Sequence, residues 1–256
     1  MTNSSRPRIA LITGGSRGLG RSMALHLADH GVDSIVTYRS ARTEADQVVA
    51  ALRAKGRLAA ALPLDVSDSA TFPSFVTGVR EALRQTWQRE RFDFLVNNAG
   101  TGLHAKFTET TEQQFEELVK VHLKGPFFLS QQLVPWIEDG GRILNVSSGL
   151  ARFTFPGYSA YAAMKGAIEV LTRYMAKELG ARRITVNTLA PGAIETDFGG
   201  GAVRDNAELN RIIASQTALG RAGLPDDIGG AVAALLSPGC HWLNGQRIEF
   251  SGGMML

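Results

Sequence analysis

The sequence is poor in cysteine and aromatic residues, and its charges nearly balance. Its 256 residues include one cysteine, Cys240, and 7% are aromatic. A single thiol excludes an intrachain disulfide framework and a cysteine-rich zinc site. Lysine and arginine number 27 against 24 aspartates and glutamates, a formal net charge of +3. Because this excess is so small, we expect no nucleic-acid partner.

Long apolar runs are also missing. The polar residues 1–8 are followed by the apolar run 9–12, which is too short for a signal peptide. No stretch approaches the roughly 18 uninterrupted apolar residues of a membrane span. Glycine (28) and proline (9) occur at ordinary frequency, which excludes collagen-like and low-complexity chains. We therefore expect a cytoplasmic protein with no membrane partner, in which residues 1–7 form a disordered tail.

Short apolar runs alternate with longer amphipathic segments along the whole chain. The runs that predict buried strands are 9–12, 34–38, 58–64, 92–96, 142–146, 184–188 and 247–250. The segments that predict helices are 19–29, 43–55, 69–88, 112–137, 158–179 and 226–236. Strands joined by such helices require a parallel sheet covered on both faces. The pattern predicts one doubly wound α/β domain of Rossmann type over residues 1–256, with about seven parallel strands.

A glycine-rich turn, Thr-Gly-Gly-Ser-Arg-Gly-Leu-Gly at 13–20, follows the first predicted strand. Gly14 permits a tight turn, Gly18 lets the backbone approach a pyrophosphate, and Gly20 allows the helix to pack closely on the strand. The spacing differs from the usual dinucleotide fingerprint. The segment also comes within one residue of a nucleoside-triphosphatase loop, but Arg21 stands where that loop needs lysine. A purely structural connection is the remaining alternative.

A tyrosine and a lysine, Tyr161 and Lys165, are four residues apart on the predicted helix 158–179. This spacing places both side chains on one helix face, with Cβ atoms about 5–6 Å apart. Alone the pair is weak evidence, because an exposed tyrosine beside a solvated lysine is common. In a doubly wound sheet, ligands bind at the carboxyl ends of the strands. Three further polar or glycine-containing segments end predicted strands there: Asn97-Asn98-Ala99-Gly100, Ser148 and Pro191-Gly192.

With these motifs the sequence resembles the short-chain dehydrogenase/reductase family over nearly its whole length, most of all 3-oxoacyl-acyl-carrier-protein reductases and related ketoreductases. The resemblance implies an oxidoreductase that transfers a hydride between a nicotinamide cofactor and a small-molecule ketone or secondary alcohol. It also implies a homodimer or homotetramer built on helices 112–137 and 158–179. The matching motifs are TGGSRGLG at 13–20, NNAG at 97–100, Ser148 with YAAMK at 161–165, PGAIETD at 191–197, and the closing segments Asn244-Gly-Gln and Ser251-Gly-Gly.

The resemblance implies a role for each catalytic residue. Tyr161 would give a proton to the carbonyl oxygen, or take it in the reverse reaction, while Ser148 would hydrogen-bond that oxygen. Lys165 would hold the nicotinamide ribose and, as a cation about 4 Å away, would lower the tyrosine pKa from its usual value near 10. The family usually has asparagine, supporting a water beside the lysine, where this chain has His122. His122 either keeps that relay or is a packed helix residue.

The residues after the second strand bear on the choice of cofactor. A carboxylate there would favour NAD, but the segment reads Tyr38-Arg39-Ser40. Arg39 and Arg17 can reach a 2′-phosphate, and one charge-assisted contact of about 1.5–3 kcal/mol gives roughly ten- to a hundredfold preference. NADP(H) is therefore favoured over NAD(H), with a solvated Arg39 and dual specificity as the alternative. The expected cofactor-binding residues are Gly14, Ser16, Arg17, Gly18, Leu19, Gly20, Tyr38, Arg39, Ser40, Asp65, Val66, Asn98, Ala99, Gly100, Tyr161, Lys165, Pro191, Gly192, Ile194 and Thr196. Asp65 is equally suited to capping the helix that follows it.

Aromatic residues lie close to the catalytic pair in sequence. Phe153, Phe155 and Tyr158 precede Tyr161, and Phe198 follows the PGAIETD motif. They predict an apolar or aromatic substrate end, with ordinary core packing as the alternative. Three glycines at 199–201 favour a mobile substrate flap over 198–219. We expect no metal ion at the site.

Two other functions compete with reduction of a small free ketone. A 3-oxoacyl-carrier-protein reductase needs basic residues at the site mouth, which Arg182 and Arg183 would supply, whereas the acidic pair Glu138-Asp139 argues against it. A cofactor-sensing binding protein without turnover would be free to lose Ser148, Tyr161 and Lys165, and this chain keeps all three. A scaffold protein has only the basic isoelectric point of about 9.2 in its favour.

Overall fold

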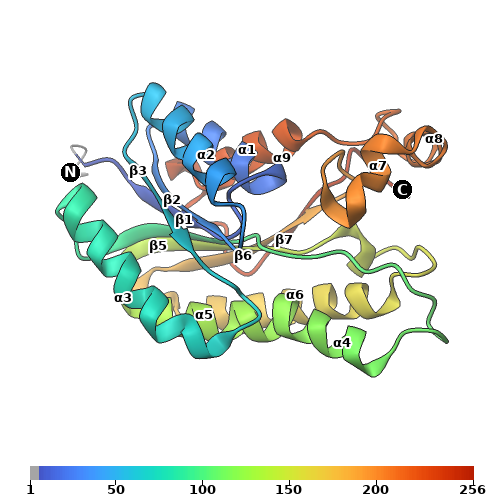
Figure 1. Ribbon diagram of the computed structural model, residues 1–256, viewed down its shortest axis with the longest axis horizontal. Helices are drawn as coiled ribbons and strands as arrows, with labels where there is room; N and C mark the ends of the chain where they lie inside the picture. The colour runs from blue at the N-terminus through green and yellow to red at the C-terminus, as the bar shows by residue number, and fades with distance from the viewer. Residues whose placement is uncertain (1–5) are drawn as a thin grey trace.

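The computed structural model describes residues 6–256, so most of the expected tail, residues 1–5, lies outside the described part. Seven parallel strands form one sheet in the spatial order β3-β2-β1-β4-β5-β6-β7 (Figure 1). The order reverses between β1 and β4, which confirms the doubly wound prediction. The strands are β1 Ile9–Ile12, β2 Asp33–Tyr38, β3 Ala59–Pro63, β4 Phe92–Asn97, β5 Ile137–Val146, β6 Thr185–Pro191 and β7 Arg247–Phe250.

Helices cover both faces of the sheet. In Figure 1, α1, α2 and α9 lie above it, and α3, α4, α5 and α6 lie below. The helices are α1 Gly18–Asp29, α2 Arg42–Ala54, α3 Phe72–Ala82, α4 Glu112–Val119, α5 Gly125–Leu133, α6 Ser159–Glu178, α7 Ala202–Asp205, α8 Ala207–Ser215 and α9 Pro225–Leu235. Within residues 6–256, no helix combines the length and the apolar character needed to cross a membrane.

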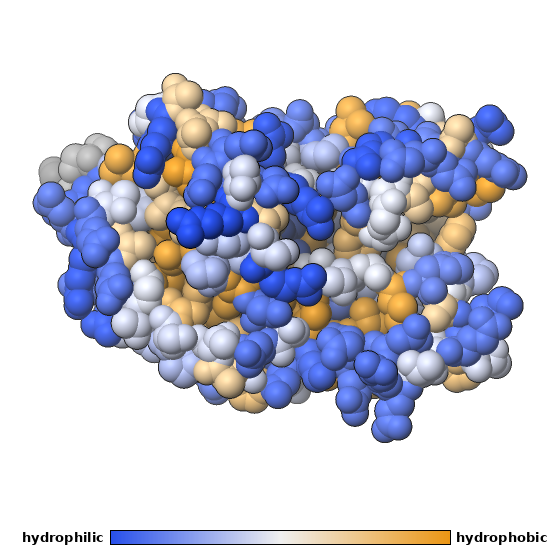
Figure 2. All heavy atoms as spheres, viewed as in Figure 1, coloured by the Kyte–Doolittle hydropathy of each residue, from blue (hydrophilic) through white to orange (hydrophobic). Residues whose placement is uncertain are grey.

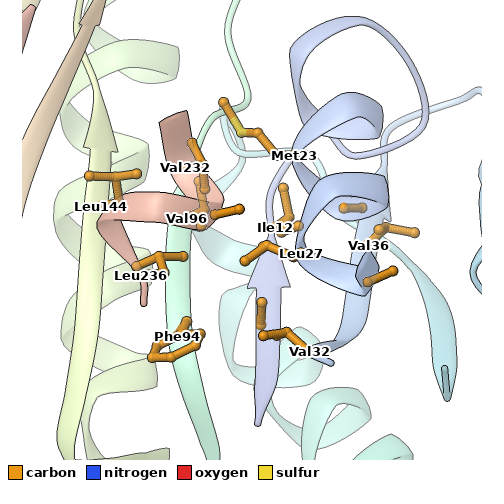
Figure 3. Packing of buried hydrophobic residues seen from close by; sticks show 14 of the residues in the cluster. Ile12, Met23, Leu27, Val32, Val36, Phe94, Val96, Leu144, Val232 and Leu236 are labelled. Carbon is orange, nitrogen blue, oxygen red and sulfur yellow. The ribbon is translucent and has the colours of Figure 1, made fainter. Parts of the chain in front are cut away.

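Strand β1, at the centre of the sheet, is apolar at every position because both of its faces are buried. Along β1, Ala10 and Ile12 belong to the core beneath α1 and α9, while Ile9 and Leu11 belong to the core on the opposite face. Figure 3 shows the first of these cores, where Met23 and Leu27 of α1 meet residues of the sheet and of α9. Each such side chain contributes roughly 1.5–3 kcal/mol on burial. Figure 2 shows hydrophilic residues over most of the surface in this view, with hydrophobic ones between the two helix layers.

Six of the seven strands begin within one residue of the predicted start, but β5 begins at Ile137 instead of residue 142. The single helix expected over 112–137 is also interrupted. A π-helical turn, Lys120–Lys124, separates α4 from α5. Pro126 has no amide hydrogen, and its ring would crowd the carbonyl of residue 122 in a regular α-helix, so a wider turn relieves that contact. This turn carries His122 into the interior, where its side chain is 2% exposed.

Candidate active site

A cavity of about 540 Å³ opens at the carboxyl ends of the strands. It is lined by every residue that the sequence analysis assigned to the cofactor, the substrate or catalysis. Their convergence follows from the topology, because the loops after parallel strands all leave the sheet at the same edge. Further residues line the cavity. Some lie in segments that the sequence analysis named without giving them a role in the site: Ala193 and Asp197 in the PGAIETD motif, and Gly199, Gly200, Val203, Leu209 and Ile213 in the segment 198–219. The others were not identified, since no motif marks them: Ala41, Leu64, Thr101, Gly102, Val121, Val146, Ser147, Leu150 and Met254.

The glycine turn forms one end of this cavity. Gly14 and Gly18 have φ angles of +65° and +53°, which side chains disfavour. A Cβ on Gly20 would lie 2.3 Å from the carbonyl oxygen of Gly14, so only glycine fits there. Helix α1 has neither a side-chain cap nor an acidic residue in its first turn. Its amino end, with free N–H groups and a positive dipole end, therefore suits a phosphate group.

The turn is held in place by the end of β4. The hydroxyl of Thr13 accepts hydrogen bonds from the amides of Asn98 and Ala99, each at 2.9 Å. The side-chain amide of Asn98 donates to the carbonyls of Thr13 and Gly14 at 2.8 and 3.1 Å. These bonds fix the glycine turn against the NNAG segment. The motif is thus structural at Asn98, while the backbone of the segment faces the cavity.

Tyr161 and Lys165 lie side by side on α6, both buried beside the loop that carries Ser148. Ser148 is a hydrogen-bond partner of the Tyr161 hydroxyl. The ammonium Nζ of Lys165 donates to the carbonyl of Val146 at 2.8 Å and lies 5.5 Å from the centre of the Tyr161 ring. The loop after β5 and one face of α6 therefore bring the three expected catalytic residues together.

Burial, and not the lysine charge, dominates the acidity of the tyrosine. It raises the pKa of Tyr161 above its usual value near 10, and the hydrogen bond from Ser148 only partly opposes this. The expected lowering by Lys165 is therefore wrong for this structure. The lysine has its own cost of burial, which lowers its pKa to about 8. Its hydrogen bond goes to a backbone carbonyl and not to the phenol.

His122 packs edge-on against Tyr161, with ring centres 5.2 Å apart. Its Nε2 lies 2.8 Å from the carbonyl of Thr101, a contact that assigns the ring proton to Nε2. The longer approach of the Thr101 amide to the same nitrogen, at 3.4 Å, is incompatible with that proton and is the weaker contact. Nδ1 is buried without a hydrogen-bond partner in residues 6–256. Burial, helped by the charge of Lys165, lowers the pKa of His122 to about 3, so the ring is neutral at pH 7.

Aromatic rings surround the other end of the cavity. The ring of Tyr161 lies 5.8 Å from that of Phe198 and 6.5 Å from that of Tyr158, measured between centres. Phe155 lies 6.3 Å from Tyr158. Since all of these rings line the cavity, they are not merely core. Apolar side chains close the same region: Leu150, Phe153, Val203, Leu209, Ile213 and Met254.

The segment 198–219, in orange beside the C-terminus in Figure 1, supplies several residues that line the cavity, among them Phe198, Val203 and Ile213. It contains α7 and α8, which the sequence analysis did not predict. Gly199, Gly200 and Gly201 have φ angles of +62°, +75° and +80°. Asp197, just before them, pairs with Arg204 and lies 3.9 Å from Arg17 of the glycine turn.

The basic residues proposed to meet a carrier protein lie elsewhere. Arg182 and Arg183 precede β6, at the opposite edge of the sheet from the cavity. Arg182 donates to Asp139 at 2.8 Å and to the carbonyls of Val134 and Ile137, so it ties the helical turn Val134–Trp136 to the start of β5. Placing these arginines at the site mouth was therefore wrong.

The position of Asp65 and the absence of a metal-binding cluster among residues 6–256 bear on two further expectations. Asp65 lines the cavity, and its carboxylate also accepts from the amide and hydroxyl of Ser67 at 2.9 and 2.6 Å. The capping role considered for it is wrong, because Asp68 caps the helical turn Ser69–Thr71 that leads into α3, while the bonds of Asp65 stay within the loop before that turn. Within the described residues, no group of three or more histidine, cysteine, aspartate or glutamate side chains is placed to hold a metal ion.

Known proteins resemble this chain over almost its full length. Residues 14–255 match the family model described as Enoyl-(Acyl carrier protein) reductase. An uncharacterized oxidoreductase of Methylorubrum extorquens is 36% identical over 247 residues, covering 96% of this chain and 97% of the relative. The hydroxynaphthalene reductase-like protein Arp2 of Metarhizium brunneum is 34% identical over 257 residues, covering 96% and 94%.

Solved structures agree with these matches. The promiscuous reductase LugOII, which catalyses keto-reduction at C1 during lugdunomycin biosynthesis, superposes with a TM-score of 0.93 at 36% identity, covering 98% of this chain and 99% of that one. The angucycline C-6 ketoreductase LanV, solved with bound NADP, superposes with a TM-score of 0.92 at 33% identity, covering 97% and 95%.

Proposed function

Because the chain belongs to the short-chain dehydrogenase/reductase family, we propose that it is an NADPH-dependent ketoreductase, or the corresponding alcohol dehydrogenase, with Tyr161 as proton donor or acceptor. One observation carries the proposal. Tyr161, Ser148 and Lys165 meet at a cavity whose other end is a glycine turn built for phosphate. Separately, each feature has a structural explanation, but together they join a cofactor cradle to a proton donor.

The residues of the cavity fit NADP(H). Gly14, Gly18 and the amino end of α1 suit the pyrophosphate, because a side chain on these glycines would strain the turn. Arg39 and Arg17 lie at the same end and can meet a 2′-phosphate, which favours NADP(H) over NAD(H). LanV, at 33% identity, has been solved with NADP. When bound, the cofactor supplies or takes the hydride.

The chain itself handles the proton. The hydroxyl of Tyr161 is protonated at neutral pH, because its pKa lies above the usual value near 10. Its proton can pass to the carbonyl oxygen as hydride addition makes that oxygen negative, which leaves the tyrosine as phenolate. Ser148, already bonded to that hydroxyl, donates to the same oxygen and stabilises the developing charge. Lys165 has hydrogens on Nζ beyond the one given to Val146, and these can hold ribose hydroxyls. His122 presents its unpartnered Nδ1 as an acceptor for a water between the lysine and solvent.

The rings around the cavity favour an aromatic ketone as substrate. Phe155, Tyr158 and Phe198 offer faces and edges to a planar ring. Among the relatives, LanV is named as an angucycline ketoreductase and Arp2 as hydroxynaphthalene reductase-like. A carrier-bound substrate is disfavoured because Arg182 and Arg183 lie at the far edge of the sheet. The segment 198–219 acts as the flap that encloses the ring system.

The protein assembles as a homodimer or homotetramer through α4, α5 and α6. Phe115, Phe127 and Phe128 on the first two helices, and Tyr174 on the third, are between 39% and 65% exposed. Exposed aromatic side chains on one helical layer are typical of an interface.

The test is reduction of a panel of aromatic and aliphatic ketones, followed by the loss of NADPH absorbance at 340 nm. We expect turnover of at least one polycyclic aromatic ketone, and a loss of about 10³-fold or more in kcat for Tyr161→Phe with NADPH still bound. Binding of NADPH without turnover of any ketone or alcohol would instead favour a cofactor sensor. An unchanged kcat for Tyr161→Phe would remove the tyrosine from the mechanism.

A further inference from the structure

We propose that Arg247 is a positioning residue, which holds the loop carrying Ser148 in its productive place. Arg247 lies on β7 and does not line the cavity. Its side chain is 23% exposed and reaches three separate elements around the catalytic residues. The inference rests on the proposed function, because it concerns the same reaction.

Each end of the guanidinium has a different partner. Nε donates to Glu169 of α6 at 2.8 Å, and Nη1 donates to Glu249 of β7 at 2.8 Å. Nη2 donates to the backbone carbonyl of Ser148 at 3.3 Å. A rigid, planar group with this spread of donors is an arginine property that lysine lacks. Arg247 therefore joins α6, β7 and the catalytic loop at one point.

The carboxylates extend this junction to both sides of Ser148. Glu169 also accepts from the hydroxyl of Ser147 at 2.7 Å, and it lies one helical turn after Lys165. Glu249 accepts from Ser251 at 2.7 Å and pairs with Arg152 at 3.4 Å. The charges of the two arginines and two glutamates cancel. Since Glu169 and Glu249 are only 14% and 15% exposed, the two remaining carboxylates would be left partly desolvated if Arg247 were removed.

These contacts restrain the loop on three sides. The carbonyl of Ser148 bonds to Arg247, the side chain of Ser147 bonds to α6, and Arg152 bonds through Glu249 to β7. The hydroxyl of Ser148 can then point at Tyr161 from a fixed backbone. Loss of the junction would move that hydroxyl relative to the substrate oxygen, and displacements of about 1 Å can cost on the order of 100-fold in rate.

The test compares Arg247→Leu and Arg247→Lys with Arg89→Leu. Arg89 is a matched control, because it is 11% exposed and joins Asp93 and Glu138 to the carbonyl of Pro7, at the amino end of β4 and away from the cavity. We expect Arg247→Leu to lower kcat by about 10- to 100-fold with KM for NADPH unchanged, and Arg247→Lys to recover part of that loss. Arg89→Leu should lower stability with kcat within about twofold of the wild type.

A double mutant shows whether Arg247 acts through Ser148. In a Ser148→Ala background, measured by single turnover at high enzyme concentration, Arg247→Leu should cost less than about threefold, because the group it positions is gone. An equal loss in both backgrounds, or an equal loss from Arg89→Leu, would overturn the proposal. If Arg247→Leu does not fold, Glu249→Gln removes one partner and must show the same dependence on Ser148. An inactive wild type would instead defeat the proposed function.

Discussion

At the scale of single residues, the site trades stability for chemistry along one stripe of α6. Tyr161, Lys165 and Glu169 follow one another at intervals of four residues, so they share a helix face. Burial raises the pKa of the tyrosine and lowers that of the lysine, so both groups are held against their preference for water. A chain selected only for stability would place apolar residues here. Their presence is the strongest residue-level sign of function.

His122 makes the stability of the protein sensitive to acid. Its folded-state pKa of about 3 lies below the usual 6.5, so the unfolded chain binds more protons between these values. The free energy of unfolding therefore decreases as the pH falls below about 6.5, because protonation of His122 then stabilises the unfolded chain. The decrease between pH 7 and pH 5 is about 2 kcal/mol. The variant His122→Asn should lack this loss. Urea unfolding of both proteins at the two pH values measures it, and an equal loss in both would contradict a neutral, buried ring.

We expect Arg39 to set the preference between the two nicotinamide cofactors. Its side chain is exposed at the cavity and takes part in no ion pair among residues 6–256, so it is available to a 2′-phosphate. Arg39→Ala should raise KM for NADPH by roughly tenfold or more and leave KM for NADH nearly unchanged. Arg42→Ala is the control, because Arg42 is equally charged and exposed but pairs with Asp46 outside the cavity. Equal effects on both cofactors would mean that Arg39 does not read the phosphate.

At the scale of helices and strands, sequence periodicity predicted all seven strands and the helices that cover the sheet, but not α7 and α8. Strand β1 was placed correctly because its apolar run is buried on both faces of the parallel sheet. The π turn at Lys120–Lys124 was missed, because a widened turn keeps the helical apolar spacing and only Pro126 hints at it. The long β5 was missed because Glu138, Asp139 and two glycines carry no strand signal.

The candidate site was predicted more completely than its electrostatics. Glycine and tyrosine–lysine motifs have fixed spacing, so their residues could be named from the chain alone. The pKa of Tyr161 could not be predicted from the sequence, because it depends on burial and on the direction in which the Lys165 side chain points. Arg247 was missed for the same reason, since its partners lie 78 and 99 residues away along the chain.

The proposed flap, residues 198–219, begins with glycines that hold left-handed backbone. Gly199 and Gly200 have φ angles of +62° and +75°, and a Cβ on either meets nothing within 4 Å. Replacing both with alanine therefore adds only backbone strain, about 1–2 kcal/mol per residue. The closed flap should be disfavoured by about 2–4 kcal/mol in total, and KM for the ketone should rise by roughly 30-fold or more with KM for NADPH unchanged.

Gly56→Ala supplies the control for that strain. Gly56 has a φ of +74° with nothing near its Cβ, and it lies between α2 and β3, far along the chain from the flap. It should lower stability by the amount expected for one such residue, about 1–2 kcal/mol, with KM for the ketone unchanged. If the flap variant also keeps its KM, residues 198–219 do not close over the substrate.

At the scale of the whole molecule, the two helical layers differ in what they leave exposed. The layer below the sheet in Figure 1 carries Phe115 on α4, Phe127 and Phe128 on α5, and Tyr174 on α6. The rings of Phe127 and Phe128 contact each other edge-on, with centres 5.0 Å apart. Exposing adjacent aromatic rings to water is unfavourable in a monomer. That free energy is regained when a second copy of the chain covers the rings.

The double substitution Phe127→Glu with Phe128→Glu tests this assembly. The two introduced carboxylates would be desolvated at the interface or would face the same carboxylates of the second copy. The proposed oligomer should therefore dissociate. Size-exclusion chromatography with light scattering should show a dimer or tetramer for the wild type and a smaller species for the variant. Trp242→Glu is the control, because Trp242 is 91% exposed in the connection from α9 to β7 and lies outside these helices. Dissociation by the Trp242 variant, with none by the phenylalanine pair, would move the interface to the other end of the sheet.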